Sequence, residues 1–336
     1  MLISSQSFTS TLPTMVPSSS VTVDRYDEKV CREIFANQNQ PNHLVLVLAG
    51  QSSDEKRQIK ELYRAIHGEE LVELLLRIKE ANPESEPVYF GLWLWMMEQP
   101  ERDAVVAKDA VERGSADDYK AIVEIYVRRK SSHLFASKQA YFAKCRSHMD
   151  KDILSVEPEH PGPKILAALA TSHRSHHDEV ISQHIANCDA KRLNEALKKS
   201  DGGMDESSII EIFSKRSLPQ LRLAFSCYRH IYGNDYIEAL EDRSGNFEDS
   251  LRVVIQCMCT PYEYYSEMIY MSLVAEVDKK VVLTRVMIGS VEVGMNKVKE
   301  AFQMRYKVKL EEAIVERVLD DDNYRDFLVA LSNASG

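Results

Sequence analysis

The sequence predicts an all-α protein built from four repeated helical units. The first observation is periodicity: from Val23 onward, apolar residues recur at spacings of three and four, with short polar breaks and no useful alternating strand pattern. The second is repetition, because four segments with an aromatic anchor can be laid over one another. Their spacings of 78, 87 and 74 residues are too long for tetratricopeptide or ankyrin arrays. Each unit is therefore expected to be a compact group of about five short helices.

Each unit follows the same order of elements. One helix carries the aromatic anchor, a short helix begins with acidic residues, and an apolar helix closes the unit after a polar turn. The anchors are Tyr63, Tyr141, Tyr228 and Phe302. The closing helices are expected at 89–97, 165–171, 250–259 and 327–331. The predicted organisation is a Ser- and Thr-rich disordered tail over 1–22, followed by repeats over 23–98, 99–173, 174–260 and 261–336.

Composition narrows the class of protein. The 336 residues are 44% apolar, which is enough for buried cores. The net charge of −10 argues against nucleic-acid binding and against simple attraction to an anionic membrane. No apolar run reaches the roughly 20 residues that span a bilayer, so any membrane contact is expected to be peripheral. The six cysteines lack zinc-finger spacing and are expected to be free cytosolic thiols.

The segment from Asp201 to Asp242 contains a candidate calcium site. Gly202 and Gly203 free the backbone to turn sharply and expose its carbonyl oxygens, and Asp242 supplies a carboxylate 39 residues after Gly203. Hard oxygen ligands of this kind suit Ca²⁺. The alternative is an ordinary helix amino-terminus, because Asp205 is a favourable N-cap residue.

Three short stretches carry a resemblance to a known family: LWMMEQPERDA over 94–104, YGND over 232–235 and VLTRV over 282–286. In register with the four repeats, they resemble the annexins, and among these the plant annexins. The resemblance covers 23–331 and implies four repeats of about five helices, packed as a curved disk. It also implies a peripheral protein that binds acidic phospholipids with the help of calcium.

The resemblance also indicates which calcium sites survive. An annexin repeat binds calcium through backbone carbonyls of the loop between its first two helices, completed by an acidic residue near the start of the fifth. The third repeat matches best, which implies one weak calcium site formed by Asp201, Gly203 and Asp242. The first and fourth loops have lost the pattern, and the second keeps Gly114, with Glu157 near its cap. The expected calcium affinity lies toward about 10⁻⁴ to 10⁻³ M, as for ligand-poor sites.

Four lysines are candidates for a calcium-independent contact with an acidic membrane. Lys198 and Lys199 precede the third loop, whereas Lys279 and Lys280 stand within the fourth. Each lysine near an anionic surface can contribute on the order of 1 kcal/mol. The alternative is a set of solvated lysines at helix ends.

Three charged residues match positions that line a hydrophilic channel at the centre of annexins: Asp103, Arg129 and Arg285. Buried charges must pair to offset their desolvation, so a structural ion network is expected, with ion conduction as the alternative. Arg129 and Arg216 also match an arginine that ends the second helix of an annexin repeat, where it is expected to meet carbonyl groups.

No catalytic site is predicted. The histidine on which a peroxidase-like activity of the family would depend is replaced by Gly50, and the partner of the redox cysteine Cys257 is replaced by Val127. The nucleotide-binding motif GxxxxGK[ST] is absent from the sequence.

A histidine cluster matches no family motif. His173, His176 and His177, with His184 and Cys188 beyond them, could hold a soft transition metal if the segment is one helix. The alternative is a polar linker between the second and third repeats. The sequence as a whole predicts a cytoplasmic, peripheral phospholipid-binding protein with weak or residual calcium dependence. The alternative is a calcium-independent interaction scaffold derived from an annexin.

Overall fold

The computed structural model describes residues 25–155, 165, 168, 181–198, 204–241, 243 and 245–334. In these parts of the chain there are nineteen α-helices, one short 3-10 helix and no strand, which confirms the predicted all-α class. The predicted tail over 1–22 lies outside the described residues. So does most of the closing helix expected at 165–171, of which Ile165 and Ala168 are described and buried.

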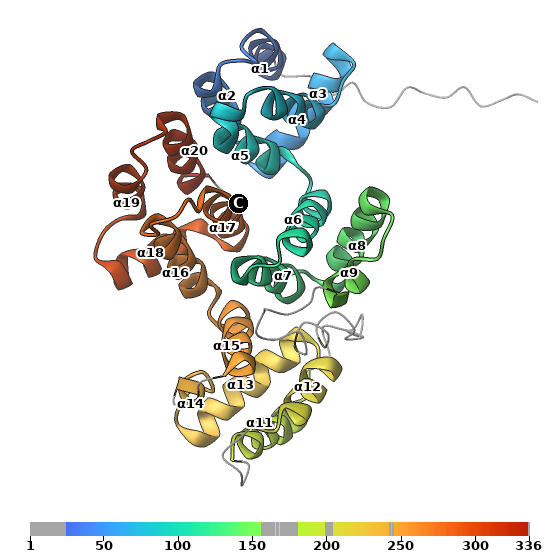
Figure 1. The fold of residues 1–336 in the computed structure, drawn as a ribbon, viewed down its shortest axis with the longest axis vertical. Coiled ribbons are helices and arrows are strands. Elements are labelled where there is room, and N and C mark those ends of the chain that lie inside the picture. The colour runs from blue at the N-terminus through green and yellow to red at the C-terminus, as the bar shows by residue number, and fades with distance from the viewer. Residues whose placement is uncertain are drawn as a thin grey trace, which may run out of the picture.

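The helices gather in four groups that follow one another along the chain (Figure 1). The first group comprises α1 (Arg25–Ala36), α2 (Pro41–Leu48), α3 (Ser53–His67), α4 (Leu71–Ala81), the 3-10 helix η1 (Pro83–Ser85) and α5 (Glu86–Met96). The second comprises α6 (Gln99–Arg113), α7 (Ala116–Arg128), α8 (Ser131–Cys145) and α9 (Met149–Ser155). The third comprises α11 (Gln183–Leu197), α12 (Glu206–Lys215), α13 (Leu218–Tyr232), α14 (Glu238–Glu241) and α15 (Asn246–Cys259). The fourth comprises α16 (Pro261–Leu273), α17 (Lys280–Val293), α18 (Met295–Tyr306), α19 (Leu310–Arg317) and α20 (Asp322–Ser332).

The aromatic anchors lie on equivalent helices of the four groups, namely α3, α8, α13 and α18. Each anchor is at most 2% exposed, because it is on the helix face that packs into its own group. Each of these helices also ends at a residue with positive φ, which breaks the helical hydrogen-bond pattern. The four terminating residues are Gly68, Arg146, Gly233 and Lys307.

Helix pairs that combine distant parts of the chain join the groups. α5 packs against α17 and α20, and α2 also packs against α20, which links the first group to the fourth. α7 packs against α15, which links the second to the third. α5 suits this position because nearly all of its side chains are apolar and buried, as expected for a helix enclosed on every side. As a result α5, α6, α7 and α17 meet around the middle of the molecule (Figure 1).

Two glycines permit close contacts between helices, one between the first and fourth groups and one within the fourth. Gly91 on α5 lies directly against the ring of Phe327 on α20. Gly289 on α17 faces Tyr265 on α16, and a Cβ at Gly289 would stand 2.7 Å from a ring carbon of Tyr265. A larger residue at either position would force the paired helices apart.

Candidate functional site

The loop predicted to bind calcium lies between α11 and α12. Asp201, Gly203, Asp242 and Lys199 fall outside the described residues. The frame around them is described. Asp205 is the N-cap of α12, and its carboxylate accepts hydrogen bonds from the hydroxyl groups of Ser207 at 2.6 Å and Ser208 at 2.7 Å. The capping role predicted for Asp205 is therefore confirmed.

A second contact joins this loop to the chain beside Asp242. The guanidinium of Arg243 donates to the backbone carbonyl of Leu197, the last residue of α11. Arg252 on α15 in turn donates to the carbonyl of Leu240 at 3.0 Å, which ties the 240–243 segment to α15. The segment that precedes α15 is thus held against the start of the α11–α12 loop.

In the corresponding loop of the second group, the acidic side chain is already hydrogen-bonded to neighbouring residues of the chain. Asp118 forms a capping box with Ser115, whose hydroxyl donates to the carboxylate at 2.6 Å. The same carboxylate accepts two hydrogen bonds from Arg113, at 3.1 and 2.8 Å. Gly114 ends α6 with positive φ, and Glu157 lies outside the described residues. The carboxylate of Asp118 would have to release these partners before it could bind a cation.

In the fourth group, lysine side chains pair with the acidic residues around the loop. The Nζ of Lys280 lies 2.7 Å from a carboxylate oxygen of Asp320, and Lys279 pairs with Asp117 on α7. The hydroxyl of Tyr324 donates to the backbone carbonyl of Lys280 at 2.8 Å. These contacts surround a cavity of about 290 Å³. A lysine ammonium therefore supplies the positive charge that neutralises Asp320.

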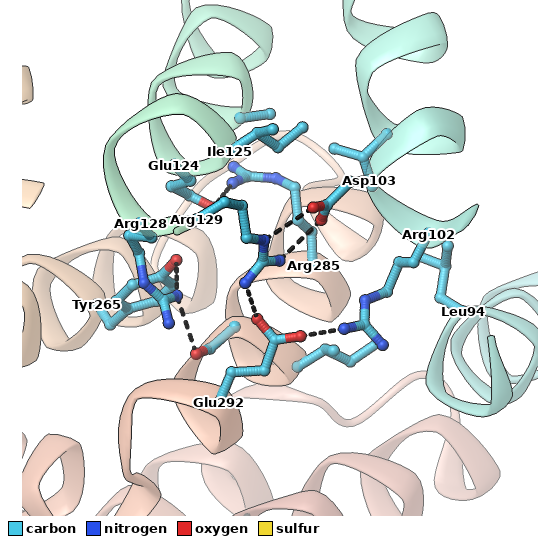
Figure 2. Close-up of a pocket in the computed structure, with 14 residues that line it drawn as sticks. Leu94, Arg102, Asp103, Glu124, Ile125, Arg128, Arg129, Tyr265, Arg285 and Glu292 are labelled. Carbon is cyan, nitrogen blue, oxygen red and sulfur yellow. Dashed lines mark hydrogen bonds and ion pairs between the residues drawn. The ribbon is translucent and has the colours of Figure 1, made fainter. Parts of the chain in front are cut away.

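The central charged residues lie together around a small cavity of about 30 Å³, drawn in Figure 2. The guanidinium of Arg129 makes two hydrogen bonds to the carboxylate of Asp103, at 2.8 and 2.7 Å. Arg129 also lies 2.7 Å from Glu292, whose other carboxylate oxygen accepts from Arg102. Two residues predicted to share a network, Asp103 and Arg129, therefore do so directly.

Arg285 belongs to a second part of the same network. It pairs with Glu124 on α7, and the hydroxyl of Tyr264 donates to Glu124 at 2.9 Å. Beside them Arg128 donates to the hydroxyl of Tyr265 at 2.6 Å and to the carbonyl of Gly289 at 3.2 Å. α6, α7, α16 and α17 all contribute to this centre (Figure 2).

The network shifts the pKa of one carboxyl group strongly. Burial alone would raise the pKa of Glu292, but Arg102 and Arg129 outweigh it and lower this pKa to about 2. The side chain of Glu292 is 21% exposed, so water has partial access to this edge of the network. The carboxylate stays ionised at any physiological pH and holds the two arginines together.

Four charged residues of this centre were not predicted from the sequence: Arg102, Glu124, Arg128 and Glu292. A usable signal exists on α17, where Glu292 follows Arg285 by seven residues and so lies on the same helix face. The pairing itself joins residues 161 and 163 positions apart, Glu124 with Arg285 and Arg129 with Glu292. Local sequence patterns contain no information about such contacts.

The prediction that the helix-ending arginines contact carbonyl groups is wrong. Arg129 ends α7 and pairs with Asp103 on α6. Arg216 ends α12 and makes two hydrogen bonds to the carboxylate of Asp189 on α11, at 2.7 and 3.1 Å. The first helix of the group offers a buried carboxylate in both cases, and an ionised partner binds a guanidinium more strongly than a carbonyl does.

Other predicted residues lie apart from this centre. Lys198 is exposed at the end of α11. His173, His176 and His177 fall outside the described residues. His184 and Cys188 lie one turn apart on α11, with 3.8 Å between Nε2 and Sγ. Within the described residues, no three potential metal ligands of the His, Cys, Asp and Glu types cluster together. All six cysteines are free thiols, as predicted.

None of the described helices has the length and apolar content that a membrane crossing requires.

Comparison with known proteins identifies one family. The Annexin family model matches residues 188–254. The chain is 28% identical to annexin A13 of Homo sapiens over 304 residues, covering 90% of this chain and 92% of that protein. It is 28% identical to annexin D2 of Arabidopsis thaliana over 319 residues, covering 93% and 96%. The solved structure of annexin III matches with a TM-score of 0.76 at 23% identity and covers 96% of each chain.

The likeness to annexin III shows the fold, a four-repeat helical disk. The family match over 188–254 and the relatives that align along nearly the whole sequence identify the chain as similar to annexins throughout its length.

Proposed function

We propose that this protein binds acidic phospholipid membranes peripherally from the cytoplasm, with one weak calcium site in the third repeat. Calcium-dependent phospholipid binding is a general property of the annexin family. Annexins are in general membrane-binding proteins without enzymatic activity, and we propose a binding role without catalysis here as well. The repeat bounds at 98, 173 and 260 are part of the same proposal.

The contact between Arg243 and the carbonyl of Leu197 is the observation that supports this most. It holds the chain on one side of Asp242 against the end of α11, from which the loop with Asp201 and Gly203 departs. Two backbone carbonyls and one carboxylate are the hard oxygen donors that Ca²⁺ prefers, but fewer than the roughly six to eight that it coordinates. The donor chemistry therefore fits calcium, at low affinity.

Two residues beside the proposed calcium site hold its two chain segments in place. Asp205 caps α12 and so fixes where the loop must end, and Arg243 anchors the opposite segment. When bound, calcium would supply positive charge between lipid phosphate oxygens and the oxygens of Asp201, Gly203 and Asp242. Without such a charge, a chain with a net charge of −10 is repelled by an anionic surface.

We also propose a calcium-independent contribution from the lysines near these loops. Lys279 and Lys280 are paired with Asp117 and Asp320, so the attraction that they offer to a membrane is largely neutralised. The greater part is assigned to Lys198 and its neighbour Lys199. Replacing both of these by glutamine should weaken chelator-insensitive binding to acidic liposomes more than the same change at 279 and 280.

A second candidate function is a calcium-independent interaction scaffold. The observation in its favour is that two other loops satisfy their carboxylates internally, through Arg113 with Asp118 and Lys280 with Asp320. In this candidate, side-chain cations take the place of calcium in the second and fourth repeats, and the third repeat has lost calcium-dependent membrane binding as well.

One sedimentation experiment separates the two candidates. The protein is mixed with phosphatidylserine-containing liposomes, with millimolar calcium or with chelator, and the bound fraction is measured for the wild type, Asp242→Ala and Asp326→Ala. Asp326 is an exposed aspartate on α20 and serves as the matched control. We expect Asp242→Ala to lose the calcium-promoted fraction while Asp326→Ala keeps it. A wild type that sediments equally with calcium and with chelator would support the scaffold.

A further inference from the structure

A second cavity lies beside the central network and is larger, about 310 Å³. Its walls come from three groups: Lys56 and Lys60 on α3, the 95–99 connection from α5 to α6 with Arg102 beyond it, and the end of α17. Lys56 and Lys60 are four residues apart and lie on one face of α3. The larger cavity shares Arg102 and Glu292 with the 30 Å³ cavity, so the two form one charged region.

Positive charge exceeds negative charge in this region. Six cationic side chains and four carboxylates line the two cavities. Each of the four carboxylates forms an ion pair with one of these cations. The pairs are Lys60 with Glu98, Arg102 with Glu292, Arg129 with Asp103 and Arg285 with Glu124. Two cations, Lys56 and Arg128, are left over in a chain whose overall charge is −10.

Both of these cations contact neutral groups. The Nζ of Lys56 lies 3.3 Å from the centre of the Trp95 ring and 3.4 Å from the Trp95 carbonyl oxygen. Arg128 donates to the hydroxyl of Tyr265 and the carbonyl of Gly289. Neither Lys56 nor Arg128 forms an ion pair within the described residues. Burial, and then the repulsion of Arg102, lower the pKa of Lys56 to about 8.

The cavity lies far from the loops assigned to the membrane. α17 starts at Lys280, in the fourth loop, and reaches the cavity at Val291 and Glu292. About 12 residues at 1.5 Å per residue separate the two ends by roughly 18 Å. A ligand in this cavity would therefore be reached from the opposite end of α17, not through the lipid-facing loops.

We propose that this cavity binds a small soluble anion that bears a phosphate group, with Lys56 as its principal ligand and Lys60 and Arg102 beside it. Site and ligand are independent of the calcium site in the third repeat. Because the walls belong to the first, second and fourth groups, an anion held there would cross-link three parts of the chain that are distant in sequence.

Phosphate is favoured over carboxylate for two reasons. A phosphate monoester carries about −1.5 to −2 charges at neutral pH, which matches the excess of two cations, whereas a carboxylate carries one. Arginine and lysine together suit a tetrahedral oxyanion, since the guanidinium offers paired donors and the ammonium a compact charge. The apolar side chains of Met96, Met97 and Val291 line the rest of the cavity, where they would contact a small organic group attached to the phosphate.

Calorimetric titration with inorganic phosphate and with glycerol 3-phosphate, in a chloride-poor buffer at pH 7, tests this directly. We expect saturable binding at one site in the wild type. Lys56→Met should weaken it at least about tenfold, because one charge-assisted contact is removed while the apolar stem is kept. Lys144→Met, at an exposed lysine on α8, is the matched control and should bind as the wild type does.

A second readout needs no substitution. After reductive ¹³C-methylation, the resonance of the Lys56 amine reports its own titration by NMR. Burial, Arg102 and Lys60 lower the pKa of Lys56, whereas Glu292 and Glu98 raise it. Phosphate in the cavity adds negative charge, so the titration midpoint of Lys56 should rise by about one pH unit or more.

Three outcomes would overturn the assignment: no saturable heat with either phosphate compound, equal affinity in Lys56→Met, or an unchanged Lys56 midpoint. The source of the phosphate is tested with phosphatidic acid vesicles. If Lys56→Met abolishes vesicle binding and leaves binding of the soluble compounds intact, the cavity recognises a lipid headgroup and the soluble ligand is wrong. The calcium-promoted binding of phosphatidylserine liposomes should be the same in Lys56→Met as in the wild type.

Discussion

At the scale of single residues, the centre of the molecule is organised by carboxylates that each serve more than one donor. Asp103 accepts from Arg129 and, at 3.0 Å, from the hydroxyl of Ser137. Glu292 accepts from Arg102 and Arg129. Charges so enclosed are stabilised through one another, and removing one partner leaves the others without compensation.

Glu292→Gln tests this at the residue scale. The pKa of Glu292 is lowered to about 2 from its usual 4.5, so its ionised form stabilises the folded state above about pH 4.5. That contribution is lost as the pH falls from about 4.5 through 2. Since the side chain is partly exposed, we expect the variant to lose roughly 1–2 kcal/mol at pH 7, and the difference to vanish near pH 2.

Chemical denaturation between pH 7 and pH 2 measures both the loss of stability at pH 7 and its disappearance near pH 2. Glu312→Gln, at an exposed glutamate of α19, should change the free energy of unfolding by less than about 0.5 kcal/mol at every pH. A constant difference between Glu292→Gln and the wild type at all pH values would contradict the role given to the ionised carboxylate.

Prediction from the sequence was least complete for single side chains and their partners. Asp103, Arg129 and Arg285 were predicted because they match positions of a known family. Their partners Glu292 and Glu124 were not predicted, because each pairing joins different helices that only the folded chain brings together. The candidate calcium ligands remain predictions, since Asp201, Gly203 and Asp242 lie outside the described residues.

At the scale of elements, the four anchor helices use the same stop signal with different residues. α3 and α13 end at glycines with φ of 74° and 84°. α8 and α18 end at Arg146 and Lys307, with φ of 56° and 62°. An L-residue with a side chain is strained in this region, whereas glycine is not.

Arg146→Gly should therefore stabilise the protein. The substitution removes the left-handed strain of about 1–2 kcal/mol but adds unfolded-state entropy, for a net gain of roughly 0.5–1 kcal/mol in thermal or chemical unfolding. The gain at Lys307 should be smaller, because its Nζ donates to the Met304 carbonyl at 2.7 Å. Gly68→Ala is the reverse control and should destabilise by about 1 kcal/mol. A destabilised Arg146→Gly would show that its side chain contributes more than the strain costs.

Gly289→Ala tests the contact between α16 and α17. A Cβ would stand 2.7 Å from the Tyr265 ring, and the Gly289 carbonyl also accepts from Arg128, so the helix cannot shift freely. We expect a loss of about 1–3 kcal/mol in the free energy of unfolding. Gly50→Ala is the matched control, since a Cβ at Gly50 meets nothing within 4 Å. Equal stability of the two variants would mean that the helices repack without cost.

At the scale of the whole molecule, periodicity predicted most of the fold. The anchors Tyr63, Tyr141, Tyr228 and Phe302 are buried in equivalent helices, because a helix must bury its apolar face in its own group. The order of packing between groups, with α5 against α17 and α7 against α15, could not be read from the sequence. It depends on which apolar surfaces remain after each group has folded.

The calcium response that we propose depends on how the acidic residues of the loops are neutralised. The second and fourth loops neutralise their acidic residues with Arg113 and Lys280. The third is the loop to which we assign calcium, so the response of the whole disk should be that of one weak site. Independent weak sites in several repeats would instead give a steep, cooperative response on a membrane surface.

A calcium titration of binding to phosphatidylserine-containing liposomes tests whether a single weak calcium site controls membrane binding. We predict a midpoint at about 10⁻⁴ to 10⁻³ M calcium, as for a ligand-poor site. The Hill coefficient should be near one, and Asp242→Ala should abolish the transition. A midpoint in the micromolar range, a Hill coefficient of two or more, or an unchanged transition in Asp242→Ala would contradict a single calcium site in the third repeat.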